Sequence, residues 1–149
     1  MLTKPIGFAW KIIPPWLRFR IIRTTQEKFT VSAAVVIINA EGKVLLLNHL
    51  LRPSSGWGLP GGFLNAAEQP EEAIRREIRE ETGMELDNLT MFQVRTVKRH
   101  IEILFRADSG GEASVQSREI LGLGWFDVES LPEKLGNSQK SVIKEVLKR

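Results

Sequence analysis

The chain has 149 residues, of which 42% are hydrophobic and 26% are charged, so its length and composition suit one globular domain with a sizeable core. Cysteine is absent, which excludes disulfides, thiolate nucleophiles and zinc–thiolate sites and is typical of a reducing cytoplasm, where we expect this protein. The net charge of +3 at pH 7 is small, and no run of about 18 apolar residues is present to span a membrane.

Residues 1–28 differ in composition from the rest, and we treat them as an arm that precedes a domain at residues 29–149. The arm has six basic side chains and one acidic one, whereas the remainder has 15 basic and 17 acidic side chains. Pro14 and Pro15 argue against one continuous helix in the arm. Three roles stay open for it: packing on its own domain, packing on a second copy in a homodimer, or peripheral contact with an anionic membrane. The mixed charges of the domain show no basic stripe, so nucleic acid is not an expected partner.

The predicted elements of the domain alternate between strands and helices. Residues 29–39 and 43–49 are rich in β-branched and aliphatic side chains and predict two strands joined by a turn at 40–42. Residues 51–62 hold Pro, Ser and Gly without periodicity and predict a loop. The other predicted elements are a helix at 70–82, strands at 91–97, 100–107 and 122–128, and a last helix that begins near residue 137 and runs to the end. This order predicts an α/β fold with a mixed sheet.

The predicted helix at 70–82 has local signals for its start and its end. Pro70 suits the first helical position, where its missing N–H is not needed, and acidic side chains follow it at the positive end of the helix dipole. Gly83 suits the residue after the last turn. At about 100° per residue, Glu77, Glu80 and Glu81 fall within one arc of about 100° beside the apolar stripe. Three carboxylates at such a border would repel one another and lose hydration, which a divalent cation with oxygen ligands would offset. An ordinary solvated acidic face is the alternative.

A longer motif includes these glutamates. Gly62 is followed after five residues by Glu68 and, after seven more, by Arg-Glu-Ile-Arg-Glu-Glu-Thr-Gly-Met at residues 76–84. This spacing resembles the signature box of the Nudix hydrolase family at every fixed position. The preceding stretch at residues 56–62, Gly-Trp-Gly-Leu-Pro-Gly-Gly, and Glu119, six residues before Trp125, also resemble that family.

The resemblance implies an α/β/α sandwich in which a loop–helix–loop motif holds one to several Mg²⁺ or Mn²⁺ ions. The implied activity is hydrolysis of the pyrophosphate bond in a nucleoside diphosphate linked to another moiety, which would be the substrate partner. A nucleotide-sensing module without turnover is the alternative function, but such a module would be expected to have lost the metal-binding carboxylates.

The same resemblance assigns roles residue by residue. Glu80 and Glu81 resemble the main metal ligands, and Glu77 resembles a third ligand or the base that deprotonates the attacking water. Arg76 would hold Glu77 in place, and Glu68 would brace the loop. The other metal-binding candidates are the backbone carbonyl of Gly61 and the carboxylate of Glu119, which is also a candidate base; an exposed loop glutamate is the alternative reading for Glu119.

Substrate recognition has weaker signals. Aromatic and cationic side chains near the motif are candidates for stacking on a base or holding a phosphate, although each also has an ordinary packing role to consider. These candidates are Arg52, Trp57, Phe63 and His100, with His49 beside them.

Overall fold

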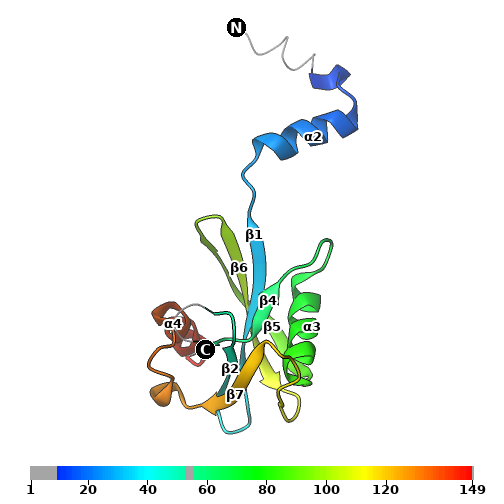
Figure 1. The fold of residues 1–149 in the computed structure, drawn as a ribbon. Coiled ribbons are helices and arrows are strands. Elements are labelled where there is room, and N and C mark those ends of the chain that lie inside the picture. The colour runs from blue at the N-terminus through cyan, green and yellow to red at the C-terminus, as the bar shows by residue number, and fades with distance from the viewer. Residues whose placement is uncertain (1–9, 53–55, 149) are drawn as a thin grey trace.

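The computed structural model describes residues 10–52 and 56–148 and contains one seven-stranded mixed sheet (Figure 1). Strands β3, β2, β1, β6 and β5 are neighbours in that order, while β4 also pairs with β1 and β7 with β2. The strands are β1 (Thr30–Ile38), β2 (Val44–His49), β3 (Trp57–Gly58), β4 (Gly61–Phe63), β5 (Leu86–Val97), β6 (His100–Ser109) and β7 (Ile120–Phe126).

Strand β1 lies inside the sheet and is buried on both faces. It runs parallel to β6 along its whole length, from the pair Thr30–His100 to the pair Ile38–Asp108, and antiparallel to β2 and β4. Successive side chains of a strand point to opposite faces, so Val35 packs in one apolar cluster and Val36 in another. The near-continuous apolar sequence of this strand follows from having a core on each side.

Helices α3 (Pro70–Thr82) and α4 (Asn137–Val146) cover the two faces of the sheet (Figure 1). Helix α3 contributes Ile74 and Ile78 to the cluster that contains Val35, while α4 contributes Ile143 to the cluster that contains Val36. A short 3-10 helix, Val128–Ser130, lies between β7 and α4. The predicted α/β/α sandwich with a mixed sheet is confirmed.

Several bounds differ from those predicted. Strand β5 begins at Leu86 rather than at residue 91, and β7 begins at Ile120 and ends at Phe126. The predicted loop at 51–62 contains β3 and the start of β4, because its glycine-rich backbone pairs with β2 and β1. Helix α4 ends at Val146, before the end of the chain.

The N-terminal segment contains a helix that was not predicted, α2 (Pro15–Thr25). Residues 10–12 are helical, residues 13 and 14 are not, and Pro15 then begins α2, where a missing N–H costs no hydrogen bond. The prediction that the two prolines prevent one continuous helix in the arm is confirmed. Figure 1 shows α2 apart from the sheet, joined to β1 through an extended segment, and none of its residues is buried. Among the described residues, no helix has the length and apolar character needed to cross a membrane.

Candidate active site

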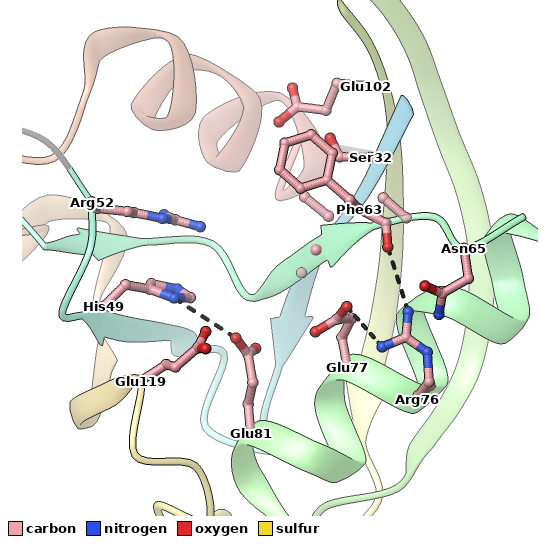
Figure 2. A pocket seen from close by; sticks show the side chains of 14 residues that line it. Ser32, His49, Arg52, Phe63, Asn65, Arg76, Glu77, Glu81, Glu102 and Glu119 are labelled. Carbon is pink, nitrogen blue, oxygen red and sulfur yellow. Dashed lines mark hydrogen bonds and ion pairs between the residues drawn. The ribbon is translucent and has the colours of Figure 1, made fainter. Parts of the chain in front are cut away.

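A pocket of about 460 Å³ opens beside the start of β4, the end of β2 and one side of α3 (Figure 2). Polar side chains from several elements line this pocket. The pairing of β4 with β1 places the start of the loop that precedes α3 beside that helix. Its lining includes His49, Arg52, Gly61, Gly62, Phe63, Arg76, Glu77, Glu81 and Glu119.

Glu81 is the most deeply buried carboxylate of this pocket. It is 9% exposed, and its Oε2 atom is buried without a hydrogen-bond partner. Burial raises the pKa of Glu81 to about 7, and the negative charges of Glu77 and Glu119 add to the shift, while Arg52 opposes it. Glu77 and Glu119 therefore lie close enough to Glu81 to disfavour its charged form.

Glu77 reaches the pocket because Gly62 has no side chain. A Cβ atom on Gly62 would lie 2.3 Å from the Oε1 atom of Glu77. Glycine at this position therefore lets the loop approach the carboxylate directly. This close contact explains why the motif has glycine at residue 62, where it faces Glu77.

Arg76 connects the loop to the helix. Its Nη1 group donates to Glu77 at 2.8 Å and to Glu80 at 3.3 Å, and its Nε group donates to Glu68 at 2.7 Å. The hydrogen bond from Arg76, with one from the backbone of Asn65, lowers the pKa of Glu68 to about 2. These charge-assisted contacts fix the orientation of Glu77 toward the pocket.

His49 and Arg52 form the opposite wall (Figure 2). Burial lowers the pKa of His49 to about 4, with a contribution from the charge of Arg52, so its imidazole is neutral at pH 7. Its Nδ1 atom lies 3.7 Å from Oε1 of Glu81. Arg52 donates from Nη2 to the carbonyl of Leu59 at 2.8 Å, while its Nη1 group is buried without a partner. A cationic donor therefore faces the acidic wall across the pocket.

The structure brings together most of the predicted site residues. Gly61, Arg76, Glu77, Glu81 and Glu119 line the pocket together. The side chain of Glu80 is 60% exposed and contacts Arg76 instead of lining the pocket.

The predicted substrate-binding residues divide into two groups. Arg52 and Phe63 line the pocket. His100 does not line it but supports Phe63 edge-on, with ring centroids 5.8 Å apart, and its ring nitrogens contact the hydroxyls of Thr30 and Ser32. Trp57 packs edge-on against Phe126 in the cluster beside α4 and is not among the residues of the pocket wall.

Sequence reasoning missed three polar residues of the pocket wall: Ser32, Asn65 and Glu102. Ser32 and Glu102 become neighbours through the parallel pairing of β1 and β6. No local pattern predicts that register, because the two strands are separated by about 70 residues of sequence. Asn65 lies three residues after Gly62, and its place within the motif was the only feature of the sequence that could have indicated a site residue.

The chemistry of this wall fits a divalent cation. Carboxylate oxygens are the preferred ligands of Mg²⁺ and Mn²⁺, and the partnerless Oε2 atom of Glu81 points to a missing positive partner. Within residues 10–52 and 56–148, no three acidic or histidine side chains already meet as a metal cluster. The carboxylates of Glu77, Glu81 and Glu119 are thus neighbours that converge on one space rather than a closed cluster.

Comparison with known proteins identifies the family. The model of the NUDIX domain family matches residues 28–146, which is most of the chain and includes every residue of the pocket wall. The chain belongs to the Nudix family. Members of the Nudix family are pyrophosphohydrolases that act on nucleotide-derived substrates and generally use divalent metal ions.

Named members of the Nudix family resemble the chain over much of its length. A MutT-like protein of Streptomyces ambofaciens is 31% identical over 115 residues, which are 75% of this chain and 73% of that protein. An ADP-ribose pyrophosphatase of Methanocaldococcus jannaschii is 33% identical over 75% of this chain and 70% of its own length. The NAD-capped RNA hydrolase NudC of Pasteurella multocida is 36% identical over 66% of this chain but only 39% of its own length.

A solved structure shows the same architecture. The MutT Nudix hydrolase of Burkholderia pseudomallei superimposes with a TM-score of 0.71 at 29% identity and covers 80% of this chain and 99% of its own. The alignment confirms the fold of this Nudix chain.

Proposed function

We propose that this protein hydrolyses the pyrophosphate bond of a nucleoside diphosphate linked to another moiety, with Mg²⁺ or Mn²⁺ as its cofactor. The observation that carries the proposal is the buried carboxylate of Glu81, whose Oε2 atom has no hydrogen-bond partner and which lines an open pocket together with Glu77 and Glu119. Relatives named as an ADP-ribose pyrophosphatase and a putative 8-oxo-dGTP diphosphatase support the substrate class.

The residues that would hold the metal are Glu77, Glu81 and Glu119, with Glu80 and the carbonyl of Gly61 at the edge of the same wall. When bound, a divalent cation neutralises pyrophosphate oxygens and makes water more acidic. Glu80 would need to turn from Arg76, and its 60% exposed side chain has room to do so.

The chain itself supplies the base and the positioning groups. Glu77 or Glu119 takes a proton from the attacking water as its oxygen bonds to phosphorus, while the bridging P–O bond breaks and the leaving phosphate takes the electron pair. Arg76 keeps Glu77 oriented through their 2.8 Å hydrogen bond. The unpartnered Nη1 group of Arg52 is a donor for a phosphate oxygen on the far wall.

The substrate wall is formed by Phe63, supported by His100. Phe63 is 63% exposed and gives a base a face on which to stack. Ser32, Asn65 and Glu102 provide hydrogen-bonding groups nearby.

The test is a hydrolysis screen on metal-free protein to which Mg²⁺ or Mn²⁺ is restored, with ADP-ribose, 8-oxo-dGTP and NAD-capped RNA among the substrates. We expect release of phosphate-bearing products only with metal, and a loss on the order of 100-fold in kcat for Glu81→Gln and Glu80→Gln. Glu71→Gln, an exposed glutamate of the same helix, is the matched control and should remain active.

Two results would contradict the proposal. One is near-native turnover by Glu81→Gln in Mg²⁺. The other is tight nucleotide binding with no product under any metal condition, which would favour a sensing module instead.

A further inference from the structure

The end of the molecule that includes α2 is unlike the rest of the surface. Large apolar side chains are exposed on the segment from residue 10 to residue 25, where no residue of α2 is buried. The exposed ones, with exposed fractions from 37% to 68%, are Trp10, Ile12, Trp16, Phe19 and Ile22. Such a concentration on one short segment is more than scattered surface apolarity and indicates a contact surface.

On α2 these side chains form a stripe. With Trp16 at 0°, a rotation of 100° per residue places Phe19 near −60° and Ile22 near −120°. Arg18 and Arg20 flank these residues on the two sides, and Arg23, near −20°, lies between Trp16 and Phe19. Trp16 and Phe19 line one surface depression together with Arg20 and Arg23. Phe19 and Ile22 line a second one together with Arg18. Aromatic rings and guanidinium groups therefore lie side by side on the surface of α2, none of whose residues is buried.

The charge of this segment has one sign. Between residues 10 and 26 there is no acidic side chain, and the first one, Glu27, is paired with Arg99 at 2.6 Å. The basic side chains of the described arm are Lys11, Arg18, Arg20, Arg23 and Lys28. A complementary partner is therefore anionic.

A distant part of the sequence adds the same combination of side chains. The turn between β5 and β6 lies next to the end of the arm, because the N–H of Thr30 donates to the carbonyl of Arg99 at 3.0 Å. That turn consists of Lys98 and Arg99, and it follows the 55% exposed Val97 at the end of β5. Phe29, which directly precedes β1, is 44% exposed. Figure 1 shows the turn and α2 at the same end of the molecule. Two separate segments thus form one basic, apolar end.

We propose that this end, consisting of residues 10–29 and the β5–β6 turn, docks on an anionic lipid surface. Tryptophan and phenylalanine suit the interfacial region of a bilayer, while arginine and lysine pair with the acidic headgroups. Such docking is independent of the hydrolysis proposed above, since the pocket is lined by other residues.

Other occupants fit less well. A second copy that offered the same end would place basic side chains against basic side chains. Nucleic acid would use the charges and the aromatic rings, but exposed aliphatic residues such as Ile12 and Ile22 have no ring for a base to stack on.

The test is co-sedimentation of the whole protein with vesicles of phosphatidylcholine, either pure or mixed with phosphatidylglycerol. We expect binding to the mixed vesicles only, with weakening by added salt. Trp16→Ser should reduce partitioning about tenfold. Arg20→Gln and Arg23→Gln should each reduce it about fivefold. None of these variants should change hydrolysis of a soluble substrate or thermal unfolding, because α2 buries no residue.

Matched controls come from other surfaces of the same chain. Met91→Ser removes a 54% exposed apolar side chain from β5, and Lys144→Gln removes an exposed cation from α4. Both should bind vesicles like the unsubstituted protein.

Three outcomes would overturn the proposal. The first is no sedimentation with either vesicle, and the second is equal weakening by the control variants. The third is loss of a concentration-dependent dimer, or of a shifted RNA band, in Trp16→Ser without vesicle binding by the parent protein, which would assign this end to a second copy or to nucleic acid.

Discussion

The close approach of Gly62 to Glu77 is the contact on which the geometry of the pocket depends most directly. The carboxylate occupies the space that a side chain at residue 62 would need, and Arg76 holds it there. The sequence motif places these three residue types at fixed spacings. The structure supplies the reason, which is that the loop and the helix come into direct contact at Gly62 and Glu77.

Gly62→Ala should therefore displace Glu77. The new Cβ would lie 2.3 Å from Oε1, so the carboxylate must rotate away from the pocket. We expect a decrease in kcat of at least about tenfold, because a small misplacement of a catalytic group is costly. Gly136→Ala, where a Cβ meets nothing within 4 Å, is the control and should be unchanged. Full activity in Gly62→Ala would exclude a role for Glu77 as positioned here.

The raised pKa of Glu81 predicts a pH dependence of stability. Its pKa is about 7 in the folded state against 4.5 ordinarily, so the folded state binds more protons between these values. The metal-free protein should lose free energy of unfolding through this group as pH rises from about 4.5 to 7. His49, whose pKa is lowered to about 4, acts in the opposite direction below pH 6.5 and masks the trend.

Glu81→Gln isolates this contribution. In urea unfolding with a chelator present, the variant should gain stability over the parent as pH rises, by about 1–3 kcal/mol at pH 7. The gain follows from removal of a buried charge that faces Glu77 and Glu119. Parallel stability curves for the two proteins from pH 4.5 to 7 would argue against the burial of a charged Glu81.

Among the elements, α3 was predicted best. Its first residue, its terminating glycine and its buried face were all readable, because capping and the 3.6-residue period are local signals. The backbone N–H of the N-cap residue Gln69 donates to the carboxylate of Glu72 at 3.1 Å, so a glutamate of the first turn satisfies that group. The arginines of the next turn contact other groups: Arg76 contacts Glu68, Glu77 and Glu80, and Arg75 donates to the carbonyl of Leu86.

The end of α3 provides a stability test. Gly83 has φ of 69°, a left-handed conformation that glycine adopts without steric cost, and its N–H donates to Arg79. Gly83→Ala should destabilise the protein by about 1–2 kcal/mol. Thermal unfolding would measure this, with Gly122→Ala as the control, because a Cβ atom on Gly122 meets nothing within 4 Å. An unchanged unfolding midpoint would mean that the helix end relaxes without penalty.

Elements that depend on distant partners were not predictable in the same way. Strands β3 and β4 are two and three residues long and exist because β2 and β1 provide hydrogen-bonding edges. The start of β5 at Leu86 depends on pairing with Ser109. The two prolines do interrupt the helical arm at residues 13 and 14, as predicted, but α2 itself was missed, because Pro15 also serves as its first residue.

For the whole molecule, the sheet determines which parts of the sequence meet. The motif on α3 indicated one wall of the pocket, and Glu119 lines the same pocket as the glutamates of that motif. Ser32 and Glu102 come from strands whose parallel register has no local signature, so the substrate wall was only partly predictable. Exposed aromatic residues were ambiguous for the same reason: Phe63 faces the pocket, but Trp57 packs against Phe126.

Binding of Mn²⁺ to the metal-free protein, measured by electron paramagnetic resonance, tests the central claim most directly because it needs no substrate. The account predicts that the unsubstituted protein and Glu71→Gln bind the ion with equal affinity, and that Glu81→Gln binds it at least about tenfold more weakly. Equal binding by Glu81→Gln, or no binding by the unsubstituted protein with or without a nucleoside diphosphate, would contradict it.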